Sequence, residues 1–383
     1  MNILLLDQYS DPGGAQQALA ELLPAIRERG WRAVVGLPGQ GKLVGVARGL
    51  GLDIERIDCG PYRSGRKSVS DMSRFPFQTP RLAAQIRKLA ERVEAELVYV
   101  NGPRVVPAAA LAGLRCPVMF HSHSWLPPNR SRSVTGLALR WMNARVVANC
   151  EFVAGQWRRY VRPQRISTIW NGVAGPAGAL VRRPGGPARI GCMGRISPEK
   201  GQHEFVAAAA RIHESLPECR FVVCGEALFG NPEAERYAAE VRSASAGLPM
   251  EFRGWVSDVY GALAELDLLL VPSVGPEATT RVILEAFAAG VPVIAFRSGG
   301  ISEVVEDGVT GVLAHSVEQM AREAVALLAS GPDWRISMAR AARAEWERRF
   351  TLEKFHEQLL GAMEEWAGQQ ATRAGQGIAS LTH

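Results

Sequence analysis

Short runs of consecutive apolar residues alternate along the chain with segments whose apolar residues recur every three or four positions. The runs in the first part of the chain are 3–6, 33–37, 97–100, 118–120 and 146–148. Helical spacing follows them, for example over 19–26 and 82–93. Continuous apolar runs are typical of strands buried on both faces. Strand–helix alternation then predicts a parallel α/β sheet in this part of the chain.

The pattern breaks at 172–188, where eight glycines and prolines crowd together, and a second α/β run follows. Its predicted strands are 189–192, 221–224, 268–271 and 291–295. We therefore expect an N-terminal lobe over 1–172, a linker over 173–188 and a C-terminal lobe over 189–350. Residues 367–383 are predicted to be a flexible tail. Two such lobes would face a cleft, and a ligand is expected there, at the carboxyl ends of the strands.

Charge is distributed unevenly over an otherwise ordinary composition. Hydrophobic residues make up 47% of the 383 residues, which excludes a disordered or collagen-like chain. Residues 1–165 hold 24 basic and 12 acidic residues, whereas 166–383 hold 20 and 26. Within 120–165, eight arginines face a single acid, Glu151. This excess favours an anionic partner for the N-terminal half, with ordinary solvated surface as the alternative.

The cysteines and the chain start bear on location. The six cysteines form no Cys-x-x-Cys pair and no zinc-spaced cluster with histidine, so free thiols in a reducing compartment are expected. The apolar run at 3–6 is too short for a signal peptide, and no stretch reaches the length of a spanning helix. The prediction is a cytoplasmic protein, or one peripheral on the inner face of a membrane.

Two glycine-containing turns follow predicted strands and could contact an anion. Gly13 and Gly14 open a helix, where backbone N–H groups and the helix dipole favour negative charge, although any tight turn also favours glycine. Arg195 and Lys200 lie in the turn 194–201, and two cations in one turn suit a diphosphate. The alternative is an exposed turn whose cations pair with neighbouring residues. Neither turn has the spacing of a dinucleotide fingerprint or a P-loop.

Two glutamates and a histidine are further candidates. Glu277 precedes a helix that Thr279 or Thr280 would cap, and Glu285 lies inside that helix. An ion pair between Arg281 and Glu285 is the bland alternative. His121 ends a strand, so it would face the cleft as a hydrogen-bond donor. A zinc pair of His121 with His123, two residues on, has no third ligand nearby in the sequence.

Together these residues resemble the retaining glycosyltransferases of family 4, which have the two-lobed GT-B fold. The resemblance extends from Asp7 to about Trp366, and its landmarks come in the family's order. They are 12–15, His121, 169–173, 194–201, 252–256, the Glu277–Glu285 pair, 285–294 and 299–308. The fold implied is α/β, with two Rossmann-like parallel-sheet lobes facing a cleft. In this fold a C-terminal helix, here about 351–366, packs back on the N-terminal lobe.

The resemblance also implies roles. The C-terminal lobe would bind a nucleotide-diphospho-sugar donor, with Arg195 and Lys200 on the leaving diphosphate and Glu285 on the ribose. Glu277 would stand at the donor sugar, and the backbone of Gly254 and Val256 would hold the base. From the other lobe, Gly13 and Gly14 would contact phosphate and acceptor, and His121 the donor sugar. No Asp-x-Asp occurs, in keeping with a metal-independent reaction and no cofactor. The acceptor would be a glycan or lipid-linked hydroxyl; no nucleic-acid motif is present.

The chain departs from the family pattern at two places. Gln16 stands where Glu is common, and Thr279 and Thr280 replace an aromatic residue and a glycine close to the donor sugar. Two other functions therefore stay open, a catalytically silent sugar-nucleotide-binding subunit and a nucleotide-sugar epimerase. Trp125, Trp141 and Trp157 lie among the arginines of 120–165. This mixture suits either transient contact with an anionic membrane or an anionic acceptor.

Overall fold

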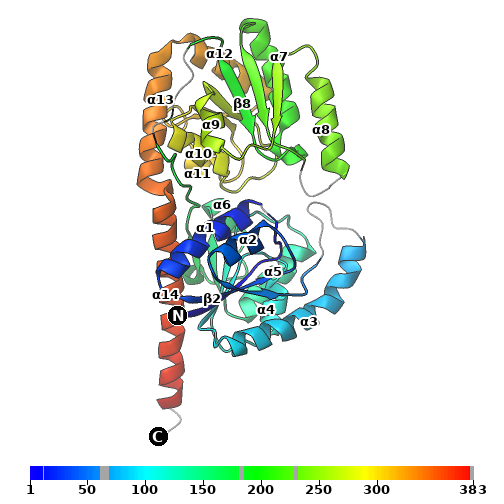
Figure 1. Cartoon of the computed structure of the whole chain (residues 1–383), viewed down its shortest axis with the longest axis vertical. Coiled ribbons are helices and arrows are strands. Elements are labelled where there is room, and N and C mark those ends of the chain that lie inside the picture. Colours follow the sequence, from blue (N-terminus) through cyan, green and yellow to red (C-terminus); the bar gives the residue numbers. More distant parts are fainter. Residues whose placement is uncertain (12, 61–68, 179, 181–184, 228–231, 380–383) are drawn as a thin grey trace. The chain divides into compact units, whose positions relative to one another are not determined.

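The computed structural model describes the chain except for residues 12, 61–68, 179, 181–184, 228–231 and 380–383. It divides into two compact units (Figure 1). Unit 1 comprises Met1–Trp170 and Phe355–His383, and unit 2 comprises Asn171–Lys354. Positions 179 and 181–184 of the predicted linker lie outside the described residues, so the linker stays a prediction.

Unit 1 is built on a seven-stranded parallel sheet in the order β3-β2-β1-β4-β5-β6-β7. The chain leaves β1 toward β2 on one side and returns to β4 on the other, so the strand order reverses between β1 and β4. The strands are β1 (Asn2–Leu6), β2 (Arg32–Leu37), β3 (Asp53–Arg56), β4 (Leu97–Val100), β5 (Val118–Ser122), β6 (Arg145–Ala148) and β7 (Ile166–Thr168).

Helices cover this sheet, and one core lies under three of them. Residues of α3, α4 and α5 pack with alternate residues of β1, β4, β5 and β6, such as Leu4, Val98 and Phe120. The helices are α1 (Gly14–Glu28), α2 (Lys42–Gly49), α3 (Val69–Arg92), α4 (Val106–Leu111), α5 (Arg130–Trp141), α6 (Glu151–Gly155), η1 (Pro163–Arg165) and α14 (Leu352–Ala379).

From Phe355 onward, the last helix belongs to unit 1. In α14, the indole of Trp366 donates a hydrogen bond to the carbonyl of Val118 at 3.1 Å, and Glu365 pairs with Arg145 at 2.7 Å. The helix continues to Ala379, through residues for which the sequence predicts a flexible tail. Glutamine and alanine, which are good helix formers, are frequent in this stretch and favour the extension, whereas Gly368, Gly375 and Gly377 oppose it.

Unit 2 contains a six-stranded parallel sheet in the order β10-β9-β8-β11-β12-β13, with its reversal between β8 and β11. The strands are β8 (Arg189–Met193), β9 (Arg220–Cys224), β10 (Met250–Gly254), β11 (Leu268–Val271), β12 (Val293–Phe296) and β13 (Val312–Ala314). The helices are η2 (Pro198–Lys200), α7 (Gln202–Ser215), α8 (Pro232–Ala244), α9 (Val259–Ala264), α10 (Arg281–Ala289), α11 (Ile301–Val304), α12 (Val317–Ala329), α13 (Pro332–Glu345) and the π-helical η3 (Trp346–Phe350). The predicted fold class, two parallel α/β sheets, is confirmed.

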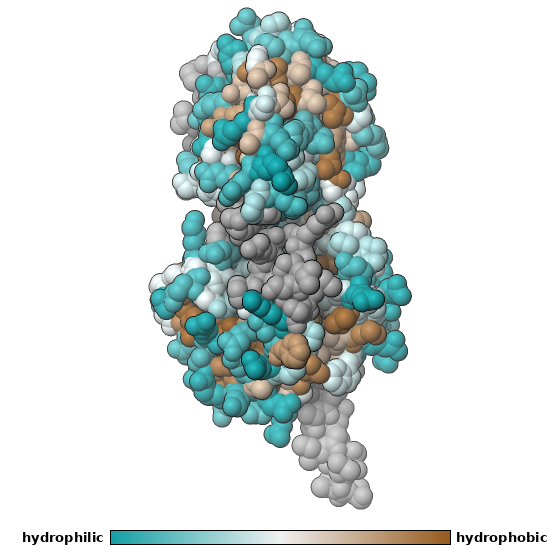
Figure 2. Space-filling model, turned by 90° about the vertical axis from the view of Figure 1, so that its right-hand side faces the viewer, coloured by the Kyte–Doolittle hydropathy of each residue, from teal (hydrophilic) through white to brown (hydrophobic). Residues whose placement is uncertain are grey.

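The surface and the thiols add little to this picture. On the face shown in Figure 2, small groups of apolar residues lie among hydrophilic ones on both units. None of the helices that the structure describes combines the length and the apolar character that crossing a membrane requires. All six cysteines are free, as predicted, and all but Cys116 are buried.

Candidate active site

In unit 2 the predicted site residues follow the carboxyl ends of neighbouring strands. Lys200 comes after β8 and Glu277 after β11, the two strands at which the order reverses. The Lys200 ammonium lies 2.8 Å from the Glu277 carboxylate, with both side chains largely buried. The fold therefore brings together a cation and a carboxylate that are 77 positions apart in the sequence, at the edge where doubly wound sheets bind ligands.

Backbone contacts hold both partners of this pair in place. Glu277 accepts a hydrogen bond at its carbonyl from the Gly300 amide, at 2.9 Å. Gly299 adopts a φ of +52°, and a Cβ there would lie 2.0 Å from the same carbonyl. Likewise Gly201, which follows Lys200, has a φ of +73°, and a Cβ would meet the Pro272 carbonyl at 1.8 Å. Only glycine fits at these two close approaches.

Arg195 occupies the start of the same turn as Lys200. Its guanidinium pairs with Glu199, four residues on, with 29% of the arginine side chain exposed. Ile196, the next residue, donates its amide to the Glu226 carbonyl at 2.9 Å, which ties the turn to the end of β9. The ion pair with Glu199 agrees with the alternative that this is an exposed turn whose cations pair with neighbouring residues. Arg195 nevertheless lies at the edge of the sheet formed by the carboxyl ends of the strands.

Glu285 and Thr280 belong to α10 and its start. The carboxylate of Glu285 lies 3.7 Å from the guanidinium of Arg281, so the ion pair that the sequence offers as an alternative to a binding role is present. Thr280 is the N-cap residue, but its hydroxyl makes no capping hydrogen bond and instead donates to the Glu277 carboxylate at 3.2 Å. The departure from glycine at this position thus supplies Glu277 with a second partner.

The remaining unit 2 candidates are backbone groups. Gly254 ends β10, and its carbonyl accepts the Gly225 amide at 2.7 Å, next to the end of β9. Val256 follows two residues later and is half-buried. Gly254 and Val256 therefore lie at the carboxyl edge, on the β10 side of the sheet. Among the residues that the structure describes, no hydrogen bond or ion pair joins them to Lys200 or Glu277.

Two buried hydroxyls at this edge have no hydrogen-bond partner in the part of the chain that the structure describes. They belong to Ser197, in the turn with Arg195 and Lys200, and to Ser273, two residues after β11. Their residues are 5% and 1% exposed. Buried hydroxyls are normally hydrogen-bonded, so these two groups are candidates for contacts with a polar ligand.

In unit 1 the glycine turn is tied to a buried carboxylate. Gly13 is the N-cap of α1, and its φ of −133° is extended backbone. Gln16, in the first turn of α1, donates its side-chain amide to Asp7 at 2.8 Å. Asp7 follows β1 and is fully buried. In this chain a glutamate at position 16 would set two carboxylates against each other in the interior.

A chain of hydrogen bonds continues from Asp7 across β4 to β5. Asn101 donates to the second oxygen of Asp7 at 2.5 Å and to the carbonyl of Ala15 at 3.1 Å. Its own oxygen accepts from Nε2 of His123 at 2.7 Å. The rings of His121 and His123 lie side by side, with centroids 3.8 Å apart. The structure thus gathers the glycine turn and both histidines around one buried network.

Tyr99 fixes the ring of His121. Its hydroxyl lies 2.5 Å from Nδ1 of His121 and 3.3 Å from the oxygen of Asn101. We assign the tyrosine proton to the shorter contact, so Nδ1 accepts it and Nε2 carries the ring proton. That Nε2 is buried and has no partner among the described residues. His121 is therefore poised to donate one hydrogen bond to a ligand.

Burial controls the protonation of this network. Desolvation lowers the pKa of His121 well below its ordinary value, with a smaller effect from His123, and lowers the pKa of His123 to about 3. Both rings are neutral at physiological pH. Desolvation raises the pKa of Asp7 to about 6, against the opposing effect of hydrogen bonds from Asn101, Tyr9 and Gln16. Among the described residues, no group of three or more His, Cys, Asp or Glu side chains is arranged to hold a metal ion.

Two doubly wound sheets, each with polar groups gathered where its strand order reverses, define a two-unit α/β protein of the nucleotide-binding type. One family model, described as glycosyl transferases group 1, matches residues 187–330, and another, glycosyltransferase family 4, matches 12–174. The chain belongs to the glycosyltransferases of group 1 and family 4. The predicted family and its GT-B fold are confirmed.

Curated relatives and solved structures agree with this assignment. The chain is 32% identical over 231 residues to D-inositol 3-phosphate glycosyltransferase of Segniliparus rotundus, which covers 53% of this chain and 49% of that protein. It is 30% identical over 178 residues to spore coat protein SA of Bacillus subtilis, covering 45% and 47%. The matched segments span about half the length of these relatives.

Among solved structures, Anabaena HepE in complex with UDP is similar over most of the chain. It has a TM-score of 0.80 and 25% identity, and the match covers 95% of this chain and 100% of that one. A second HepE structure, in complex with UDP-glucose, has a TM-score of 0.78 over the same shares.

Proposed function

We propose that the protein transfers a sugar from a nucleotide-diphospho-sugar to a hydroxyl acceptor, with retention of configuration at the sugar. Family membership supports this reaction, as does the similarity to a protein solved with UDP and with UDP-glucose. The relatives' names indicate acceptors as different as inositol phosphate and a phosphatidylinositol dimannoside. A glycan or lipid-linked acceptor is the proposal for this chain.

One observation carries the proposal furthest, the Lys200–Glu277 pair at the reversal between β8 and β11. As the nucleoside diphosphate departs, its oxygens gain negative charge. In this proposal Lys200, with Arg195 in the same turn, stabilises that charge once the two cations exchange their contacts with Glu277 and Glu199 for contacts with the diphosphate. Glu277 would exchange its contact with Lys200 for one with the donor sugar. Ser197 and Ser273 supply buried hydroxyls for further contacts with the donor.

In unit 1, the proposal gives His121 a single task. Its Nε2–H donates to the donor sugar, and Tyr99 keeps that proton on Nε2. Because burial keeps the ring neutral, the histidine contributes a hydrogen bond and no positive charge. Gly13 and Gly14 would present backbone N–H groups of the first turn of α1 to phosphate or acceptor. Glu285 would hold the ribose, and Gly254 and Val256 the base.

The test begins with the donor. UDP, GDP and ADP are each added to the full chain and thermal unfolding is followed, since a ligand at 100 times its dissociation constant stabilises by about 2.7 kcal/mol. The stabilising nucleoside diphosphate is then titrated by calorimetry into Glu277→Ala and Glu285→Ala. We expect Glu285→Ala to weaken its binding about 10- to 100-fold, the loss of hydrogen bonds to a charged group. Glu277→Ala should bind it normally and lose turnover.

The two variants serve as controls for each other, since both remove a glutamate close to an arginine or lysine of unit 2. Equal losses of nucleoside diphosphate affinity would contradict the division of roles. Release of the nucleoside diphosphate in the presence of acceptor identifies the transferase. A binding subunit releases none, and an epimerase alters the donor without any acceptor.

A further inference from the structure

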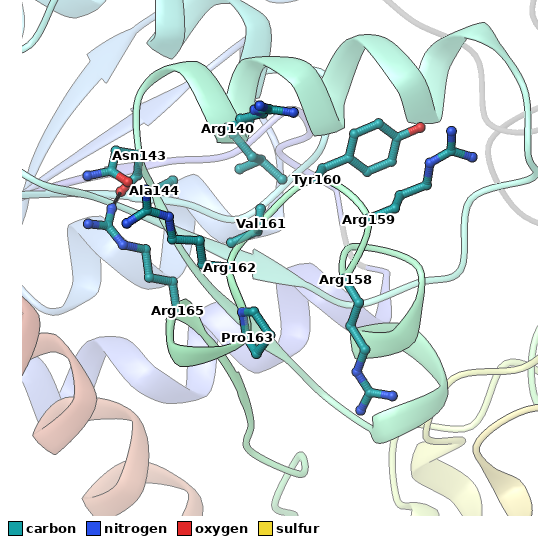
Figure 3. Close-up of a pocket in the computed structure, with 11 residues that line it drawn as sticks. Arg140, Asn143, Ala144, Arg158, Arg159, Tyr160, Val161, Arg162, Pro163 and Arg165 are labelled. Atoms are coloured by element: carbon teal, nitrogen blue, oxygen red, sulfur yellow. Dashed lines mark hydrogen bonds between the residues drawn. The ribbon is translucent and has the colours of Figure 1, made fainter.

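A pocket in unit 1 collects arginines from the C-terminal end of α5 and the segment that leads from α6 to η1. Its volume is about 370 Å³. Figure 3 shows Arg162 and Arg165 close to Asn143 at one end, with Arg159 beside Tyr160 at the other. The residues lining this arginine pocket are Leu139, Arg140, Asn143, Ala144, Arg158, Arg159, Tyr160, Val161, Arg162, Pro163 and Arg165.

Most of the positive charge in the arginine pocket is not neutralised. Arg158 pairs with Glu151 at 2.5 Å, and the guanidinium of Arg165 donates to the Asn143 carbonyl. Arg140, Arg159 and Arg162 form no ion pair among the described residues, and all three are exposed. Glu151 is the single acid in the whole segment 120–165. The pocket therefore presents several guanidinium groups to solvent. The planar guanidinium group, with its several N–H donors, is well suited to binding phosphate oxygens.

An exposed apolar stripe runs along the same helix as Arg140. Val134, Leu137 and Trp141 are 46%, 56% and 68% exposed. Their spacing of three and four residues puts them on one face of α5, while Ala138 and Leu139 are buried on the other side. A tryptophan that is two-thirds exposed next to an arginine is typical of side chains at a membrane interface.

We propose that the arginine pocket and the stripe Val134–Leu137–Trp141 together bind the surface of an anionic lipid bilayer. The pocket takes lipid phosphates and the stripe enters the headgroup layer. A soluble phosphate would satisfy the arginines but leaves the stripe without a partner. Nucleic acid would place a negative backbone against three exposed aliphatic and indole groups. The site lies within unit 1, and its occupation requires no donor.

The structure also shows which residues of 120–165 do not take part. Trp157 is fully buried and donates its indole N–H to Ser122 at 2.9 Å. Arg132 donates its Nε to the Leu126 carbonyl at 2.6 Å and lies 4.8 Å over the ring of Trp125. These three residues are structural, so a test that reverses Arg132 would perturb the fold. Of the three tryptophans singled out in the sequence, Trp141 is the one on the surface.

The experiment uses the full chain and vesicles of phosphatidylcholine with or without phosphatidylglycerol. The protein should co-sediment with the anionic vesicles at low salt and dissociate at high salt. Each basic residue at the surface is worth about five-fold in binding, so Arg140→Gln, Arg159→Gln and Arg162→Gln together should weaken it about 100-fold. Trp141→Ala should weaken it about tenfold.

Matched controls remove the same groups elsewhere on unit 1. Arg27→Gln, Arg48→Gln and Arg81→Gln remove three other exposed arginines, and Phe77→Ala removes a side chain that is 77% exposed. These variants should bind the vesicles within about fivefold of the wild type. Equal losses in the two arginine triples, or unchanged binding of Trp141→Ala, would overturn the site. Binding of millimolar inorganic phosphate by a protein that binds no vesicles would also overturn it, because the pocket would then belong to a soluble anion.

Tryptophan fluorescence locates the contact independently. Trp141 and Trp255 are the two tryptophans exposed in the described chain. With brominated anionic lipids, the Trp255→Phe variant should be quenched as strongly as the wild type, and Trp141→Phe should not be quenched. Quenching that survives Trp141→Phe would place the membrane contact elsewhere. Neither readout depends on sugar transfer, so failure here and failure of the proposed activity are distinguishable.

Discussion

Arg195→Ala should reduce turnover about 10²- to 10³-fold while the protein stays folded. Removal of one preorganised group that stabilises developing charge typically has a cost of this size. In the structure, the guanidinium of Arg195 lies in the turn after β8, with Lys200 five residues on. Its side chain forms an ion pair with Glu199, which is partly exposed and adds little to stability. Steady-state kinetics and thermal melting of the purified variant measure the two quantities.

Arg211→Ala is the matched control for this variant. Arg211 also belongs to unit 2 and pairs with a glutamate, Glu318, at 2.7 Å, but it lies on α7 away from the strand ends. Its removal should leave turnover unchanged. Near-normal turnover of a folded Arg195→Ala protein would show that the arginine has no part in the departure of the diphosphate. Equal losses in the two variants would point to a general effect of charge.

Gln16→Glu should destabilise the protein at neutral pH, and acidification should relieve most of the loss. The substitution puts a carboxylate in place of the amide that donates to Asp7 at 2.8 Å. Two buried carboxyl groups at that distance share one proton, and the pKa of the second ionisation rises. A rise of about two units in this pKa corresponds to a loss of about 3 kcal/mol in the free energy of unfolding at high pH. Denaturant unfolding at pH 5 and pH 8 measures the difference.

The sign follows from proton binding in the two states. Burial raises the pKa of Asp7 from 3.8 to about 6, so between these values the folded wild-type protein holds a proton that the unfolded chain has released. This contribution to stability therefore falls as pH rises from about 4 to 6. In Gln16→Glu the pH range over which stability falls extends to higher pH, because the pKa of the second ionisation of the carboxyl pair is higher. Gln17→Glu is the control, because Gln17 is the exposed neighbour in the same turn. A similar, pH-independent loss in both variants would contradict the interpretation.

Sequence patterns located most of the strands that are buried on both faces and missed the half-exposed edge strands, together with the buried three-residue edge strand β13. The apolar runs 97–100 and 268–271 coincide with β4 and β11. By contrast β3 (Asp53–Arg56) and β10 (Met250–Gly254) begin their sheets' strand orders and carry polar residues. An edge strand that is half exposed has no continuous apolar run, so hydrophobicity alone does not reveal it.

The sequence revealed only part of the candidate site, because contacts between residues on different strands depend on the strand order. Asp7 and Asn101 each directly follow an apolar strand, which is a signal for a residue at the carboxyl edge, yet neither was predicted to take part. The hydrogen bond between them requires that β4 lies beside β1, and the link to the histidines requires that β4 also lies beside β5. The local sequence of each strand does not reveal the order of strands in the sheet. The same holds for Tyr99 and His121. The sequence predicts Thr279 or Thr280 as an N-cap, and it could not show that the hydroxyl of Thr280 instead donates to Glu277.

The return of the chain to unit 1 at Phe355 makes the order of synthesis matter. Residues 1–170 leave the ribosome before unit 2, but the helix that carries Phe355, Leu359 and Trp366 is made after it. These three side chains are almost fully buried. Until they emerge, the part of unit 1 that they pack against stays exposed, whereas the uninterrupted unit 2 can fold as soon as its 184 residues, 171–354, are complete. A messenger truncated before codon 355 would therefore yield an intact second unit joined to an incomplete first one.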